Sequence, residues 1–189
     1  MNCMMCNSNL AQTECVNVSQ TVTIVPRLEY SNNLLHSIVD ILKTKKTELK
    51  KLNRNFLELD DDDHTYVKAL DFERTIVFSL EILSQIQKRM NSISGINSIP
   101  ELLPLTIPMI RTVSAQLFSL LPVCSQNLSE LSVHLGSIIL DSAILTEARF
   151  DFNQSNAESS LVLNEVKLMV DSKISKQYPN LDFSKACNT

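Results

Sequence analysis

The stretch at residues 42–56, LKTKKTELKKLNRNF, concentrates side chains that could bind an anion. It contains one acidic residue, Glu48, and six basic ones, although the formal net charge of the chain is −4. The basic residues are Lys43, Lys45, Lys46, Lys50, Lys51 and Arg54. Such a row is either an ordinary solvated face or a surface that attracts anionic lipid or an acidic protein. Because salt screens exposed charges beyond about 8–10 Å, either contact must be close.

Acidic residues dominate a later part of the chain, residues 123–166, which holds six acids and one base, Arg149. The acids are Glu130, Asp141, Glu147, Asp151, Glu158 and Glu165. The two oppositely charged regions could meet between neighbouring copies, or each could be a separate solvated face. The basic stretch has one aromatic residue, Phe56, and no recognition motif, so we expect no nucleic-acid partner.

The five cysteines have the chemistry for a metal or redox site but not the spacing. They are Cys3, Cys6, Cys15, Cys124 and Cys187. A structural zinc site needs four Cys or His ligands, usually in two close pairs, and the sequence has one such pair. A thioredoxin-type pair follows a strand and opens a helix, which the neighbouring residues do not indicate. We therefore expect free thiols in a reducing cytoplasm and no metal.

The acidic run DDDDH at residues 60–64 does not fit a calcium loop, which needs a glycine at its sharp turn and alternating ligands. We interpret it as the tip of a helical hairpin, where one aspartate caps the next helix. The histidines His36, His64 and His134 lie far apart, and no nucleophile, phosphate-loop or zinc-protease motif accompanies them. We predict no catalytic residue, no cofactor and no enzymatic activity.

The composition favours an all-α fold. The chain has 189 residues, two glycines and no tryptophan, whereas folds rich in tight turns or phosphate-binding loops need residues that tolerate positive φ. No uninterrupted apolar run reaches the roughly 18 residues of a membrane span. A secretory signal requires basic residues near its start, but the first basic residue of this chain is Arg27. Any membrane contact is expected from outside the bilayer.

Apolar positions at alternating steps of three and four predict two long helices that pack on each other. The first covers residues 28–59 and the second about 62–93, so together they form a long antiparallel hairpin. The seam of the first helix is Leu35, Ile38, Leu42, Lys45, Leu49, Leu52, Phe56 and Leu59. The seam of the second is Tyr66, Ala69, Phe72, Ile76, Leu80, Leu83, Ile86 and Met90.

The residues before the hairpin are predicted to form a flexible arm, residues 1–26, with a short extended piece at Val22–Val25. Pro26 marks the expected start of the helical domain, which covers residues 27–181. A short tail, residues 182–189, follows it.

After the hairpin, three prolines spaced four residues apart indicate an irregular apolar connector, because each would break a regular helix. They are Pro100, Pro104 and Pro108. Two to three further helices follow and pack partly on the hairpin. Their expected positions are about 108–121, from Pro122 onward, and about 157–177.

The order of these parts is distinctive. A long basic helix, an acidic tip and a second long helix precede the segment SIPELLPLTIPMIRTVSAQLFSLLP. LSELSVHLGSIILDSAILTEARFDF and then SSLVLNEVKLMVDSKISKQYPNL follow. This layout resembles the ESCRT-III superfamily, in particular the archaeal CdvB-type cell-division proteins. The resemblance covers about residues 28–181 and consists of layout and apolar positions rather than an invariant motif.

The resemblance implies a non-enzymatic subunit that forms filaments with itself and with ESCRT-III-like paralogues, and that constricts or severs membrane in cell division. It implies a cytoplasmic protein, peripheral on the inner face of the cell membrane at the division site. By position, the six basic residues of 43–54 would contact anionic lipid or a neighbouring subunit. The acidic regulatory or lateral contact would be made by Glu130, Asp141 and Glu147.

Some archaeal members of this family continue into a winged-helix segment and a motif that recruits a Vps4-type ATPase. This chain stops eight residues after Leu181, so it looks like a short paralogue without that extension, and we expect any link to the ATPase to be indirect. A second function class stays open beside the resemblance. A soluble helical adaptor could bind partner helices through the apolar faces of its C-terminal helices.

Overall fold

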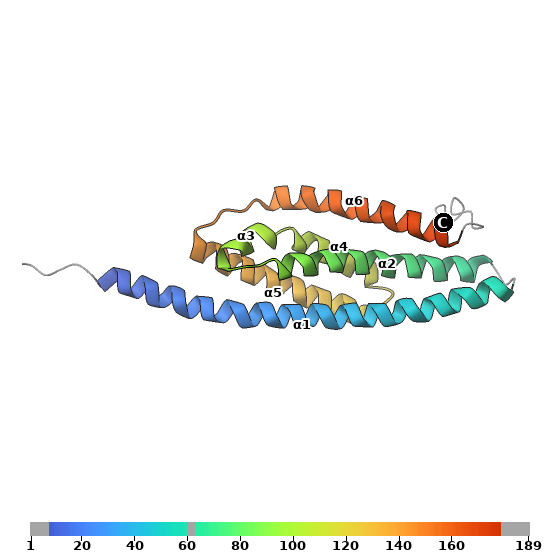
Figure 1. Cartoon of the computed structure of the whole chain (residues 1–189), viewed down its shortest axis with the longest axis horizontal. Helices are drawn as coiled ribbons and strands as arrows, with labels where there is room; N and C mark the ends of the chain where they lie inside the picture. Colours follow the sequence, from blue (N-terminus) through green and yellow to red (C-terminus); the bar gives the residue numbers. More distant parts are fainter. Residues whose placement is uncertain (1–7, 60–62, 179–189) are drawn as a thin grey trace, which may run out of the picture.

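The computed structural model describes the backbone of residues 8–59 and 63–178, and the side chains of residues 23–53 and 67–178. These parts of the chain contain six α-helices, a 3₁₀ turn and no strand (Figure 1), which confirms the all-α fold. The elements are α1 Ser8–Leu59, α2 Asp63–Asn91, η1 Ile96–Ser98, α3 Ile99–Leu102, α4 Thr106–Leu117, α5 Pro122–Thr146 and α6 Phe152–Gln177. Residues 60–62 of the predicted tip and the tail lie outside the described residues.

The first helix, α1, begins well before the predicted boundary at Pro26. It is continuous over 52 residues, about 78 Å at 1.5 Å per residue, and its first turns extend beyond the other helices in Figure 1. The extended piece at Val22–Val25 was therefore a wrong prediction, because these residues are helical. A proline removes one helical hydrogen bond, but Ile24 and Leu28 on either side of it pack on the core, which favours a continuous helix. The division into arm, domain and tail stays a prediction.

The two long helices pack together as the predicted hairpin. Two contacts between side chains give its antiparallel direction. Asn53 of α1 bonds to Glu73 of α2 near the tip, and His36 bonds to Gln87 toward the open end. The two helices therefore run in opposite directions along α2, as the predicted hairpin requires.

The buried face of α1 follows the predicted seam as far as Leu49 and then shifts. Leu35 and Leu42 are fully buried. Leu52 is 45% exposed, so its place in the seam was wrongly predicted. Asn53 is buried instead, because the face continues from Leu49 by a step of four residues. The seam residues whose side chains are not described are Phe56, Leu59 and Tyr66.

The second helix, α2, is buried on two sides, which its single predicted seam did not indicate. Ile76, Leu83 and Ile86 are fully buried, as expected. Val77 and Phe78 are also buried, because α4 and α6 both contact α2 in addition to α1. A helix covered on two sides needs more apolar residues than one three/four seam provides.

The connector is irregular, as its prolines predicted, and it leads into two helices that pack on each other. Leu103 and Leu105 are buried between the short α3 and α4. Pro122 opens α5 as expected, and α5 packs against both α4 and α1. In length and hydropathy α5 could cross a membrane, the one such helix among the described residues, but 44% of its apolar window is buried inside the bundle.

The last helix, α6, returns along α2 on the side away from most of α1 (Figure 1). It begins at Phe152 rather than Ala157, because the Asp151 side chain accepts a hydrogen bond of 2.8 Å from the Asn153 backbone N–H and caps the helix. It ends at Gln177, as predicted. The residues that it buries are Ser159, Val166, Val170 and Ile174.

Candidate functional site: charged surfaces of the hairpin

The lysines of the predicted basic face fall into two groups. Some form an ion pair with an acidic residue of α1, and the others do not. Lys43 Nζ lies 3.4 Å from Asp40 Oδ1, and Lys45 Nζ lies 2.7 Å from Glu48 Oε2. The predicted seam position of Lys45 is half-buried, so its stem packs while its charged end reaches solvent. Exposed pairs of this kind contribute about 0.2–1 kcal/mol each. They reduce the positive charge at this end of the row.

The other described lysines of the face, Lys46, Lys50 and Lys51, form no ion pair within the described part of the chain. Lys51 is exposed, and Lys46 and Lys50 are half-buried at the edge of α1. The side chain of Arg54 lies outside the described residues.

Two further lysines, from α6, join Lys46 and Lys50 along one groove. Lys173 and Lys176 come from the last turns of α6, and Val77 of α2 lies at the bottom of the groove. Sequence reasoning missed these two residues, although they are spaced three apart and therefore share a helix face. The missing information was tertiary: only the return of α6 along α2 places them opposite α1.

The acidic residues of α5 lie against the N-terminal half of α1, away from its lysine row. Arg27 donates from Nη1 to Asp141 Oδ2 over 2.6 Å and from Nη2 to the Ser137 hydroxyl over 2.6 Å. The Tyr30 hydroxyl donates to Glu130 Oε1 over 2.7 Å, and this hydrogen bond raises the pKa of Tyr30. Within one copy, then, Glu130 and Asp141 do not meet the lysines. Their contact with a neighbouring copy stays a prediction.

The third predicted acid, Glu147, stands just after α5. Its backbone is left-handed, with φ at 53°, and its N–H bonds to the Ala143 carbonyl, so the residue closes the helix. Its side chain is exposed, and its regulatory or lateral contact stays a prediction.

A buried carboxylate ties the end of α6 to both helices of the hairpin. Glu73 of α2 is fully buried. Its Oε2 accepts hydrogen bonds from Asn53 Nδ2 of α1 over 2.6 Å and from the Tyr178 hydroxyl, just after α6, over 2.8 Å. Gln177 Nε2 donates to the other oxygen over 3.4 Å. We call Asn53, Glu73, Gln177 and Tyr178 the Glu73 cluster.

The contribution of the Glu73 cluster to stability is expected to depend on pH. Burial and the hydrogen bond to Glu73 raise the pKa of Tyr178 to about 12 from its ordinary 10.0. Below pH 10 the phenol is neutral in both the folded and the unfolded chain. Above it the unfolded chain loses the proton first, so the contribution of Tyr178 to stability is lost between pH 10 and about 12.

Tyr178→Phe is expected to lower the free energy of unfolding by about 1–3 kcal/mol at neutral pH, because Glu73 loses a donor in a buried place. That difference should shrink as the pH rises from 10 toward 12. Urea unfolding of both proteins, followed by circular dichroism across this range, measures it. A difference that stays constant with pH would contradict the role given to the Tyr178 proton.

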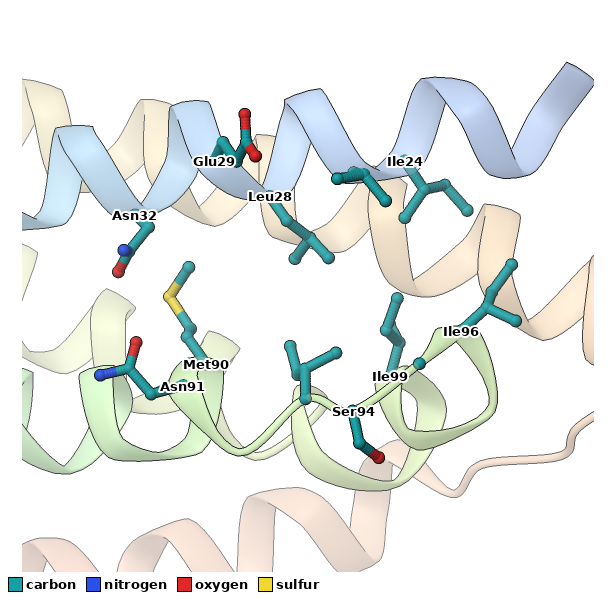
Figure 2. A pocket seen from close by; sticks show the side chains of 12 residues that line it. Ile24, Leu28, Glu29, Asn32, Met90, Asn91, Ser94, Ile96 and Ile99 are labelled. Carbon is teal, nitrogen blue, oxygen red and sulfur yellow. The ribbon is translucent and has the colours of Figure 1, made fainter.

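An apolar groove lies at the open end of the hairpin, where α1 passes the connector (Figure 2). Ile24 and Leu28 of α1 face Met90, Ile96 and Ile99 across it, and its volume is about 330 Å³. The carboxylate of the neighbouring Glu29 points away from the gap in Figure 2. The groove offers apolar contact and no group with evident reactivity.

Of the five cysteines, the structure describes the side chain of one, Cys124. Cys3, Cys6 and Cys187 lie outside the described residues, and the side chain of Cys15 in α1 is not described. Cys124 is a buried free thiol, and burial raises its pKa. In the described part of the chain, no three His, Cys, Asp or Glu side chains are placed to hold a metal ion.

No protein-family model matches the chain, and comparison with solved structures finds no significant match.

Proposed function

We propose that the chain is a non-enzymatic, filament-forming subunit that assembles on anionic membrane and drives constriction or scission in cell division. The observation that carries this proposal is the long hairpin with a lysine row along α1 whose central members have no acidic partner in the described structure. The acids Glu130 and Asp141 interact elsewhere in the same copy. The row is thus available to an anionic surface.

The order of the helices supports the same proposal. A long hairpin, an irregular proline-containing connector and the further helices after it are the parts on which the resemblance to the archaeal ESCRT-III-like CdvB proteins depends. On this proposal the protein is cytoplasmic and peripheral on the inner face of the membrane at the division site. It polymerises with itself and with ESCRT-III-like paralogues.

A soluble adaptor is the alternative, and exposed apolar side chains on the last two long helices favour it. Val133, Leu140 and Ile144 are exposed along one side of α5. Leu161 and Leu168 are exposed on α6, seven residues apart and so on one face. Exposed apolar side chains that share one helix face suit contact with another protein, and a partner helix or a second copy could cover them.

Co-sedimentation with vesicles tests the membrane part of the proposal. The full chain should pellet with vesicles that contain phosphatidylserine and stay in solution with purely phosphatidylcholine vesicles. Binding should weaken as salt rises, because screening shortens the reach of exposed charges. The adaptor would be favoured if sedimentation depends on neither lipid composition nor salt and the protein forms a stable dimer in solution.

A further inference from the structure

The groove that carries Lys46, Lys50, Lys173 and Lys176 is formed by three helices. Its walls are α1 and α6, its floor is α2, and its volume is about 450 Å³. Val77 of α2 and Ile174 of α6 supply the apolar part of the surface. Lysine stems can lie along such surface while their ammonium groups stay in water, and four lysine side chains line this one groove.

The charges in this groove do not balance. The lining contains one carboxylate, Glu81, and its Oε1 lies 2.6 Å from Lys173 Nζ. Lys46, Lys50 and Lys176 have no ion pair with any of the described residues. In a chain whose formal net charge is −4, this is a local concentration of like charge, and it destabilises the approach of α6 to α1 unless an anion joins them.

We propose that this groove binds a phosphorylated anion, which bridges the lysines of α1 to those of α6. Lysine is suited to this because its ammonium group is a point charge with three donors and can meet phosphate oxygens from several directions. One source of the anion is a lipid headgroup, and in that case the inference rests on the proposed membrane function. The other source is a soluble polyphosphate, which needs no membrane.

Binding in this groove has a structural consequence, because half of its lysines belong to α6. An anion held from both sides favours the arrangement in which α6 lies along α2. The backbone amides of α6 should therefore exchange hydrogen more slowly when the anion is bound. A lysine row on α1 alone would bind anions without this effect on α6.

The experiment compares two double variants that remove the same charge. The groove variant is Lys50→Gln with Lys176→Gln. The control variant is Lys88→Gln with Lys167→Gln, which changes one exposed lysine on the hairpin and one on α6, both outside the groove. The probes are inorganic triphosphate, measured by calorimetry, and vesicles of phosphatidylcholine with a phosphatidylinositol phosphate.

The groove variant is expected to bind triphosphate at least about tenfold more weakly than the parent chain, since each lysine near an anionic phosphate contributes substantially. The control should stay within about threefold of it, because charges outside the site are screened. Triphosphate should slow hydrogen exchange in residues 152–177 of the parent chain and not of the groove variant. Tighter binding of the vesicles than of triphosphate would identify the lipid headgroup as the source.

If triphosphate affinity falls equally in the two variants, or in neither, the groove is not the binding site. The membrane proposal would still stand, because net charge or the rest of α1 would then explain vesicle binding. If the parent chain binds triphosphate through the groove but does not bind acidic vesicles, the groove is supported and the membrane proposal is contradicted. No binding of triphosphate or of phosphoinositide vesicles by the parent chain would overturn the groove outright.

Discussion

Leu42→Asp is expected to unfold the hairpin. Leu42 is fully buried in the main core cluster. Truncation of a buried leucine costs about 2–5 kcal/mol, and a carboxylate buried without a partner adds a larger penalty. Because domains of this size are stable by about 5–15 kcal/mol, the sum removes most or all of the stability. Circular dichroism should show lost helicity, or a melting transition far below that of the parent chain.

The chain offers a matched control for this substitution ten residues further along the same helix. Leu52→Asp makes the same chemical change where the side chain is 45% exposed, so the cost should be about 0.5 kcal/mol. Leu49 is buried as well, so Leu49→Asp should resemble Leu42→Asp. Similar melting of the Leu42 and Leu52 variants would mean that the described face of α1 is wrong.

Reversal of three lysines is expected to have the largest effect on membrane binding. In the Lys45→Glu, Lys46→Glu, Lys50→Glu variant, each site loses an attraction of about 1 kcal/mol to an anionic surface and gains a repulsion. Vesicle affinity should therefore fall by about a hundredfold or more. Helicity should stay, because Lys and Glu have similar helix propensities. The new carboxylates at positions 46 and 50 would even face the lysines of α6 and attract them, where the native lysines repel them.

The matched control reverses three exposed lysines outside the basic face. Lys68→Glu, Lys88→Glu, Lys167→Glu changes the net charge by the same amount on exposed parts of α2 and α6. It should keep most of the vesicle binding seen in co-sedimentation. If the basic-face variant binds acidic vesicles like the parent chain, the lysine row is solvated surface only.

The sequence predicted the hairpin, the connector and the start of α5, because these depend on local rules. Apolar residues spaced three and four apart define a helix face. Pro122 marks a helix start because the first turn of a helix tolerates proline. Pro26 was misread by the same kind of rule. Its local preference for a boundary is outweighed by the packing of Ile24 and Leu28, which sequence spacing cannot show.

The polar features of the bundle could not be predicted, because they depend on residues that are distant in sequence. Glu73 looks like an ordinary surface acid, yet it is buried where Asn53 and Tyr178, 20 and 105 positions away, supply hydrogen bonds. The groove is similar. The row of lysines on α1 was evident, but Lys173 and Lys176 become part of it only through the antiparallel return of α6.

Electron microscopy of the purified full chain on vesicles tests the central claim most directly. The protein is imaged alone, with phosphatidylcholine vesicles, and with vesicles that also contain phosphatidylserine. The proposal predicts ordered filaments, or lipid drawn into tubes, on the acidic vesicles and much less on the neutral ones. Monodisperse particles that look the same in all three samples, with vesicles left round and bare, would contradict it.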